Sequence, residues 1–199
     1  MLGMTTDYSE GDALIVVDVQ NDFADPAGSL YAKGAEELIP ALNDEIRAAR
    51  KGIAPVFYTQ DWHPASTPHF QKDGGPWPVH CVANTRGAEF HPDLLMDGEV
   101  VQKGVDGEDG YSGFSTRDPQ SGATSSTLLA NRLREYGVTH VVVSGLATEY
   151  CVLETVLDAC RLGFEVTVKR SLIGGVEIQP GDSERALERM RAAGAEIVA

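Results

Sequence analysis

The sequence predicts an α/β fold, a single-domain three-layer sandwich in which a central, mostly parallel sheet of about six strands is flanked by helices. Apolar runs rich in β-branched residues alternate along the chain with segments of helical spacing, as in strand–helix–strand units. The chain has 199 residues, of which 42% are hydrophobic, so it can bury one substantial core. We therefore expect one domain over residues 1–199, with residues 1–11 as a flexible N-terminal extension.

Six short apolar segments have the composition of buried strands. They span residues 13–19, 53–59, 99–102, 138–144, 164–168 and 196–198. Four segments between them place their apolar residues on one helical face, at residues 35–51, 124–136, 149–162 and 183–193. Ser183 is the expected N-cap of the last helix, because its hydroxyl can accept a hydrogen bond from the first turn.

Residues 61–99 break this alternation. The stretch is long, irregular and rich in His, Pro, Gly and Trp. Loops of this length in a compact domain are commonly functional or disordered. The aromatic and imidazole content argues against disorder, so we expect a functional loop.

The net charge of −14 bears on the partners of the protein. Phosphate backbones and anionic lipid surfaces bind clustered Lys and Arg, so we expect neither nucleic acid nor a membrane as a partner. The first residues show no secretory signal, which favours a cytoplasmic protein. The three cysteines, Cys81, Cys151 and Cys160, have no disulfide or zinc-finger spacing and are expected to be free thiols.

Four reactive side chains follow predicted strands. Asp18 lies near the end of the first strand, and Asp61 and Lys103 follow the second and third. Cys151 comes shortly after the strand that ends near residue 144. Because ligands bind outside the carboxyl ends of strands in open α/β sheets, we expect these four side chains to converge on one edge.

Cys151 lies where a strand gives way to a helix. The positive end of the helix dipole and an ammonium such as that of Lys103 would lower the pKa of its thiol. Free amides of Ala147 and Cys151 at the same turn suit an oxyanion hole. Together with Asp18, these groups suffice for acid–base and nucleophilic catalysis. Each residue alone also fits a structural role, Cys151 as a small buried hydrophobe and Asp18 as a hydrogen-bonded strand end.

Three of the five histidines, His63, His69 and His80, fall within the irregular loop that Asp61 opens. One carboxylate and two or three imidazoles form a plausible site for zinc, iron or manganese with coordination positions left open. A single histidine is more often a surface or core residue. The clustering of three favours a metal site.

Six short motifs carry a family resemblance. They are VDVQNDF (17–23), QDWHP (60–64), WPVHC (77–81), KG (103–104), YSGF (111–114) and GLATEYCV (145–152). With them the chain resembles the nicotinamidases of the isochorismatase-like cysteine hydrolases, from about residue 13 to residue 198. The resemblance implies the Rossmann-like sandwich of that superfamily.

The resemblance also assigns roles to residues. It implies a catalytic triad of Asp18, Lys103 and Cys151, an oxyanion hole at Ala147 and Cys151, metal ligands Asp61, His63 and His80, with His69 as a fourth ligand found in some members, and substrate-binding residues Phe23, Trp77, Tyr111, Leu146 and Tyr150. A non-proline cis peptide is expected between Leu146 and Ala147.

The function implied by the resemblance is hydrolysis of nicotinamide to nicotinate and ammonia through a cysteine thioester, in NAD salvage. Pyrazinamide is an expected second substrate. One divalent metal ion is expected, zinc first, with iron or manganese as alternatives. A homo-oligomer is compatible with the resemblance.

Three other functions compete with this one. The first is another amidohydrolase of the superfamily, acting on a carbamoyl or ureido compound. Such relatives generally lack the Asp and His metal set, which here is complete. The second is a non-catalytic metabolite-binding protein, against which the intact triad counts. The third takes Asp61, His63 and His80 as the ligands of an iron oxygenase, which would leave the triad without a purpose.

Overall fold

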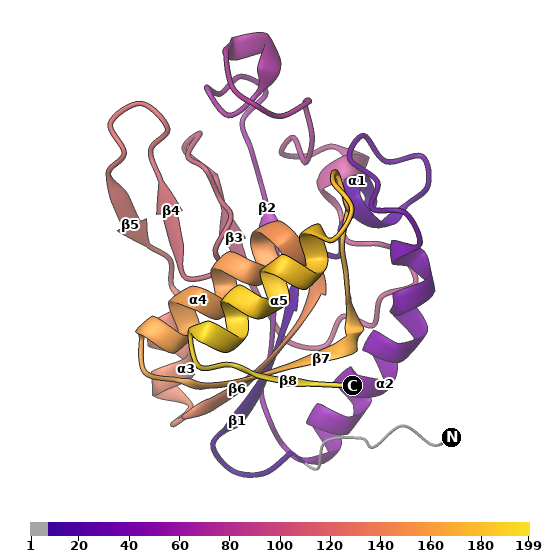
Figure 1. Ribbon diagram of the computed structural model, residues 1–199, viewed down its shortest axis with the longest axis vertical. Coiled ribbons are helices and arrows are strands. Elements are labelled where there is room, and N and C mark those ends of the chain that lie inside the picture. The colour runs from indigo at the N-terminus through magenta and orange to yellow at the C-terminus, as the bar shows by residue number, and fades with distance from the viewer. Residues whose placement is uncertain (1–7) are drawn as a thin grey trace.

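The computed structural model describes residues 8–199 (Figure 1). Six strands form one sheet in the order β3-β2-β1-β6-β7-β8. They are β1 (Asp12–Val17), β2 (Val56–Asp61), β3 (Glu99–Lys103), β6 (His140–Leu146), β7 (Glu165–Gly174) and β8 (Glu196–Val198). Every neighbouring pair is parallel, which confirms the predicted fold class. A separate antiparallel pair consists of β4 (Ser115–Arg117) and β5 (Thr124–Ser126).

Helices cover both faces of the sheet. The α-helices are α1 (Asn21–Ala24), α2 (Ile39–Lys51), α3 (Leu129–Glu135), α4 (Leu153–Arg161) and α5 (Asp182–Ala192). Short 3₁₀ segments occur at Ala35–Leu38, Gln71–Asp73 and Arg86–Ala88, and a π-helical turn at Thr148–Val152. Figure 1 shows α4 and α5 lying side by side over one face.

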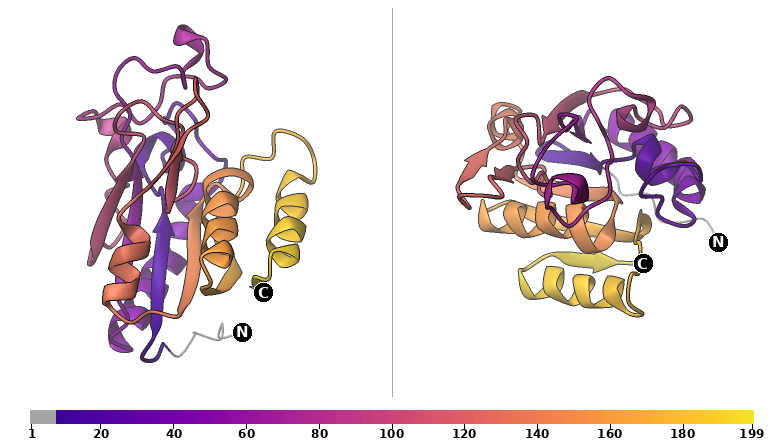
Figure 2. Two further views of the ribbon diagram at one scale, coloured as in Figure 1. Left: turned by 90° about the vertical axis from the view of Figure 1, so that its left-hand side faces the viewer. Right: turned by 90° about the horizontal axis from the view of Figure 1, so that it is seen from above.

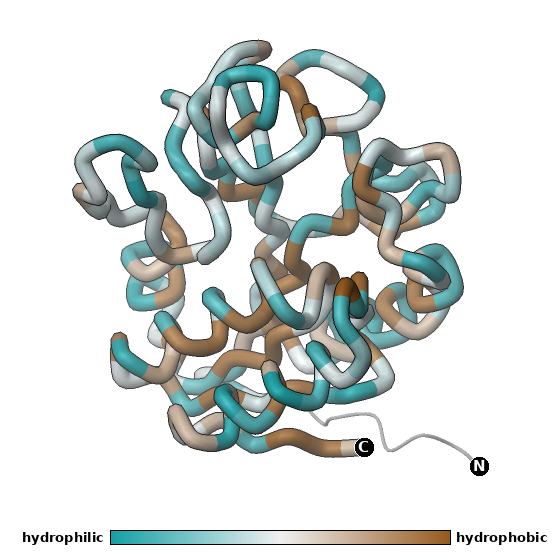
Figure 3. Tube along the Cα trace, turned by 45° about the horizontal axis from the view of Figure 1, so that its top comes forward, coloured by the Kyte–Doolittle hydropathy of each residue, from teal (hydrophilic) through white to brown (hydrophobic). Residues whose placement is uncertain are grey.

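The alternation of side chains along β1 divides the core into two halves. Ala13, Ile15 and Val17 pack with the apolar residues of α3, α4 and α5. Leu14 and Val16, which point to the opposite face, pack with those of α2. All five side chains are fully buried, as expected for a central parallel strand covered on both faces. Figure 3 shows apolar segments in the interior and polar ones in the outer loops and along the helices.

The expected N-terminal extension covered residues 1–11, of which 1–7 lie outside the described residues. Tyr8 is buried, and its hydroxyl donates a 2.8 Å hydrogen bond to Glu45 Oε1. Lys169 Nζ bonds the same carboxylate at 2.7 and 2.8 Å. Residue 8 is therefore part of the packed fold.

Two of the predicted helix starts differ from the structure on the outer layers of the fold. The helix predicted over residues 124–136 is shorter than expected, because residues 124–126 form β5 and α3 begins only at Leu129. The hydroxyl-rich run before it bonds elsewhere, since Thr127 Oγ1 donates to Gly113 O at 2.6 Å and accepts from the Leu129 amide at 3.2 Å. The N-cap of α5 is Gly181 rather than Ser183, whose hydroxyl donates to Glu149 at 2.9 Å.

The irregular segment between β2 and β3 lies above the carboxyl ends of the strands, where other loops join it (Figure 2). The sheet order reverses direction between β1 and β6, which is where ligand sites form in such sheets. None of the helices in the described range combines the length and apolar content needed to cross a membrane.

Candidate active site

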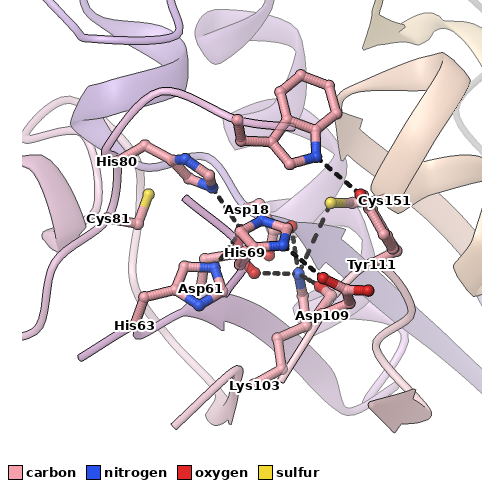
Figure 4. A network of polar contacts seen from close by, with 12 residues as sticks. Asp18, Asp61, His63, His69, His80, Cys81, Lys103, Asp109, Tyr111 and Cys151 are labelled. Atoms are coloured by element: carbon pink, nitrogen blue, oxygen red, sulfur yellow. Dashed lines mark hydrogen bonds and ion pairs between the residues drawn. The ribbon is translucent and has the colours of Figure 1, made fainter. Parts of the chain in front are cut away.

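The four strand-end residues come together as the sequence predicts (Figure 4). Asp61 and Lys103 end β2 and β3 and lie opposite each other in the sheet register. Asp18 follows β1, and Cys151 lies in the turn after β6. Because these strands are neighbours in the order β3-β2-β1-β6, residues far apart in sequence share one edge.

Lys103 is the centre of the polar network. Its Nζ atom lies 2.7 Å from Asp18 Oδ2, 2.5 Å from Asp61 Oδ1 and 3.7 Å from Cys151 Sγ. It also donates to the carbonyl of Gly110. The lysine side chain is fully buried, and although burial opposes its charge, the two carboxylates raise its pKa well above the ordinary value. The ammonium therefore stays charged and offsets the negative charge of the two neighbouring carboxylates.

The two carboxylates differ in their proton affinity. Burial raises the pKa of Asp18 to about 6, against the attraction of Lys103. Asp61 is buried as well, but Lys103 and His63 together outweigh the burial and lower its pKa below the ordinary range. Asp18 is therefore the carboxylate that can exchange a proton near neutral pH, whereas Asp61 stays ionised.

The backbone at Asp18 points its side chain into the site. Its φ angle is +48°, a left-handed conformation uncommon for residues other than glycine. Asp18 Oδ1 accepts a hydrogen bond of 2.7 Å from Thr59 Oγ1, and Oδ2 accepts from Lys103. Both carboxylate oxygens are thus fixed by donors.

The expected lowering of the Cys151 thiol pKa was wrong. Burial raises the pKa of Cys151 well above its ordinary value, and the carboxylates of Asp18 and Asp61 add to this, while Lys103 opposes it. The sulfur and oxygen atoms of these three acidic groups lie within 4.8 Å of one another. The free protein thus carries a neutral thiol, and a base must remove its proton before it can attack.

The turn that carries Cys151 has an unusual backbone. The peptide bond between Leu146 and Ala147 is cis, as the resemblance implied. The helix predicted from residue 149 starts instead as a π-helical turn, in which the amides of Tyr150 and Val152 both donate to Ala147 O. Gly145 is needed just before it, because its φ is +102° and a Cβ there would lie 2.2 Å from Val17 O.

Three buried imidazoles lie beside this network (Figure 4). One ring nitrogen from each of His63, His69 and His80 lies within 4.8 Å of the others. Asp61 Oδ2 is 3.7 Å from His63 Nε2 and 3.9 Å from His80 Nε2. The structure thus brings together all four predicted metal ligands, with Asp61 shared between this cluster and Lys103.

The hydrogen bonds of these rings fit a metal site. His80 Nδ1 lies 2.8 Å from Pro78 O and His69 Nδ1 lies 2.6 Å from Asp109 Oδ1, which leaves the Nε2 atom of each ring available. His63 is fully buried, and neither of its ring nitrogens has a hydrogen-bond partner among the described residues. Burial lowers the pKa of His69, and that of His80 to about 4, so both rings are neutral at pH 7, as metal ligands must be.

A cavity of about 300 Å³ opens above Cys151. Four of the five predicted substrate-binding residues line it: Phe23, Trp77, Tyr111 and Tyr150. Trp77 Nε1 donates a 2.7 Å hydrogen bond to the Tyr111 hydroxyl, which fixes the two rings relative to each other. The fifth predicted residue, Leu146, does not line the cavity, because its side chain is buried in the core half that contains α2.

Several lining residues were not predicted from the sequence. They are Ser29, Leu30, Tyr31, Gly110, Val176 and Ile178. Val176 and Ile178 come from the loop after β7, and residues 29–31 from the loop after α1. No sequence motif marked these loops, since only the fold brings them over the cavity.

Gln20 was also missed as a site residue. Its side chain is fully buried and bonds the backbone of Asp61 twice, donating to Asp61 O and accepting from Asp61 N, both at 2.8 Å. This pairing holds the end of β2 against the residues after β1. Its place two residues after Asp18, within the motif VDVQNDF, was the available signal.

Comparison with known proteins agrees with this geometry. Residues 12–199 match the model of the isochorismatase domain. The chain is 38% identical to the nicotinamidase of Escherichia coli (strain K12), with 93% of each chain covered. It is 40% identical to the nicotinamidase/pyrazinamidase of Mycobacterium tuberculosis (strain ATCC 25618 / H37Rv), covering 94% of this chain and 97% of that protein.

A solved structure is similar as well. The pyrazinamidase of Pyrococcus horikoshii in complex with zinc superimposes with a TM-score of 0.84 at 43% sequence identity, over 94% of this chain and 98% of that one. The strand order, the convergent strand ends and these matches lead to one conclusion. The chain belongs to the isochorismatase family.

Proposed function

We propose that this protein hydrolyses nicotinamide to nicotinate and ammonia, with Cys151 as the nucleophile. The observation that carries the proposal is the position of Lys103 Nζ, bonded to Asp18 and Asp61 and 3.7 Å from Cys151 Sγ, at the base of a cavity with aromatic walls. The similarity over nearly the full chain to proteins named nicotinamidase supports the choice of substrate.

The first half of the reaction forms a thioester. Asp18 takes the proton of the Cys151 thiol, and the resulting thiolate is stabilised by the Lys103 ammonium. The sulfur attacks the carboxamide carbon, and the negative charge that develops on the amide oxygen is held by the amides of Ala147 and Cys151. Asp18 returns the proton to the nitrogen, the C–N bond breaks and ammonia leaves.

The second half regenerates the thiol. A water molecule attacks the thioester carbon while Asp18 accepts one of its protons. The same two backbone amides hold the oxyanion again. The C–S bond then breaks, Cys151 recovers a proton from Asp18, and nicotinate is released. A pKa of about 6 suits Asp18 for accepting and returning a proton near neutral pH.

Asp61, His63 and His80 would hold one divalent ion, with His69 as a fourth ligand. Zinc is our first choice, because two or three imidazoles and a carboxylate suit it and because a similar pyrazinamidase is in complex with zinc. A bound ion supplies a Lewis acid at the cavity, where it attracts a ring nitrogen of the substrate.

The cavity walls suit a flat heteroaromatic ring. Trp77 and Tyr150 meet edge to face with ring centroids 4.9 Å apart, and Phe23 lies 5.5 Å from the His80 ring. Their apolar surfaces can sandwich a pyridine or pyrazine, so pyrazinamide is expected as a second substrate. An aliphatic ureido compound would gain little from these rings.

Ammonia and nicotinate formation from nicotinamide by purified, zinc-loaded protein tests the proposal. We expect stoichiometric formation of both products, with pyrazinamide also cleaved. An acid quench during turnover followed by mass spectrometry should reveal an acyl group on Cys151. Turnover of a ureido or carbamoyl amide without turnover of nicotinamide would reject the substrate while leaving the nucleophile in place.

A further inference from the structure

The glycine-rich acidic loop at residues 104–110 has no part in the mechanism above. It nevertheless contacts the site at several points: Gly110 O accepts from Lys103 Nζ, and Gly107 O accepts from Thr67 Oγ1 at 2.5 Å. Gly104, with φ +75°, packs so tightly on the His63 ring that a Cβ would lie 2.5 Å from its Cε1 atom. The loop therefore borders both the lysine and the histidine cluster.

Asp109 makes the most specific of these contacts. Its Oδ1 atom lies 2.6 Å from His69 Nδ1, and both side chains are largely buried, with exposed fractions of 15% and 4%. The Asp109 backbone is itself anchored, because its amide donates to Arg117 O at 2.8 Å and its carbonyl accepts from Arg117 N at 3.0 Å. The carboxylate is thus held at a fixed place beside the ring.

We propose that Asp109 is a positioning residue that makes His69 the fourth metal ligand. The proposal rests on the metal site of the proposed function. A carboxylate that accepts from Nδ1–H fixes the tautomer in which Nε2 carries the lone pair, and it raises the basicity of that nitrogen. The His69 ring stacks on that of His63, with centroids 4.7 Å apart, so it already faces the cluster. Asp109 would thereby prevent the ring from rotating away from the other histidines of the cluster.

The alternative is that Asp109 only ties the loop to residue 69. The two readings differ in one measurable quantity, the affinity for a divalent ion. Partners that orient metal-bound histidines typically contribute 10- to 100-fold to metal affinity. A purely structural contact would change the unfolding temperature and leave the metal affinity unaltered.

The test compares Zn²⁺ dissociation constants, measured by competition with a chromogenic chelator at fixed pH. Asp109→Ala should weaken Zn²⁺ binding about 10- to 100-fold. Asp109→Asn, which keeps a hydrogen-bond acceptor, should weaken it less. The matched control is Asp106→Asn, which removes an exposed carboxylate from the same loop and should leave the constant unchanged.

A double mutant identifies the route of the effect. If Asp109 acts through His69, then His69→Ala and His69→Ala/Asp109→Ala should bind Zn²⁺ equally weakly. In the Co²⁺-substituted protein, the visible absorption band of Asp109→Ala should shift in the same direction as that of His69→Ala. Thermal unfolding of each metal-free variant confirms that it is folded.

Two results would overturn the proposal. One is a Zn²⁺ affinity of Asp109→Ala equal to that of Asp106→Asn. The other is a further loss of affinity when Asp109→Ala is added to His69→Ala, which would indicate a long-range charge effect. Nicotinamide turnover at saturating Zn²⁺ separates the two hypotheses: turnover by wild type together with either result rejects the role of Asp109 and leaves the proposed function intact.

Discussion

Lys103 Nζ lies 3.7 Å from Cys151 Sγ, although 48 residues separate the two in sequence. The same ammonium bonds the Asp18 carboxylate, so acid, amine and thiol form one connected unit. Since the pKa of the thiol is raised by burial and by the neighbouring carboxylates, the reaction depends on proton transfer within this unit.

Replacing the nucleophile should abolish turnover. Cys151→Ala is expected to lower kcat for nicotinamide by at least about 1000-fold, because no thioester can form. Ammonia release measures this directly. Cys160→Ala is the matched control: this thiol lies in α4, is only partly buried and should be dispensable within about twofold, as small core changes away from a site are. Equal rates for Cys151→Ala and wild type would exclude the nucleophile.

Removing the central cation should affect both rate and stability. Lys103→Met leaves Asp18 and Asp61 buried without a counter-charge, which typically costs about 3–5 kcal/mol of unfolding free energy. Urea unfolding measures the loss, and kcat should fall sharply as well. Lys169→Met breaks the buried pair with Glu45 instead and serves as the control. It should lower stability by a similar amount and leave kcat nearly unchanged, so a large fall in kcat there would argue against a specific role for Lys103.

The pH dependence of kcat/KM should reveal Asp18. Its pKa of about 6 lies above the ordinary value, so the carboxylate that acts as base is present above pH 6 and becomes protonated below it. We expect activity to fall about tenfold per pH unit below pH 6. Zn²⁺ must be kept saturating at each pH, since protonation of histidine ligands releases metal. In Asp18→Asn the residual activity should lose this slope, whereas an identical slope would assign the group elsewhere.

Metal removal should be reversible and should destabilise the fold. Chelation is expected to abolish turnover, and added Zn²⁺ should restore it. Zn²⁺ should also raise the unfolding temperature, because a free Zn²⁺ concentration of 100 times the dissociation constant stabilises the folded protein by about 2.7 kcal/mol. Calorimetry with and without Zn²⁺ measures the shift. The Zn²⁺-dependent rise in unfolding temperature should be mostly lost in His63→Ala. It should be retained in His91→Ala, because His91 lies outside the histidine cluster. A shift that survives in His63→Ala would place the ion elsewhere.

Glu149 should affect substrate binding through the loop after β7. Its carboxylate accepts hydrogen bonds from the amides of Val176 at 3.1 Å and Glu177 at 2.9 Å, and from Ser183 Oγ. Glu149→Ala frees the loop that carries the lining residues Val176 and Ile178. We expect KM for nicotinamide to rise about 3- to 10-fold with a smaller change in kcat, the pattern of lost ground-state binding. Glu154→Ala, which removes a partly exposed acid on α4, is the control, and the same rise in KM there would contradict a specific role for Glu149.

The sequence predicted the fold because its central strands are unambiguous. Five successive residues of β1 are apolar and fully buried, a pattern typical of a strand covered on both faces. Prediction was weaker where polar residues bond to distant partners. The predicted strand ended at residue 168, whereas β7 continues to Gly174, because the polar residues 169–171 do not resemble a buried strand. Lys169 is buried there only because it pairs with Glu45, more than a hundred residues away.

Much of the site could be predicted from sequence, because its reactive residues follow predicted strands. Asp18, Asp61, Lys103 and Cys151 could be placed on one edge because the carboxyl ends of parallel strands share an edge. Their protonation depends on burial and on mutual distances, which no spacing in the sequence encodes. The predicted direction of the Cys151 pKa shift was therefore wrong, since burial of the thiol, to which two carboxylates add, outweighs the attraction of one ammonium.

The sequence by itself thus determined the fold class and the reactive groups, because hydrophobic periodicity and residue chemistry are local properties. The tertiary structure decided which groups touch: that Asp109 meets His69, that Gln20 holds Asp61 and that the loop of Ile178 borders the cavity. Such contacts join loops whose paths depend on the packing of the whole domain, and the free energy of each contact depends on how far that packing excludes water.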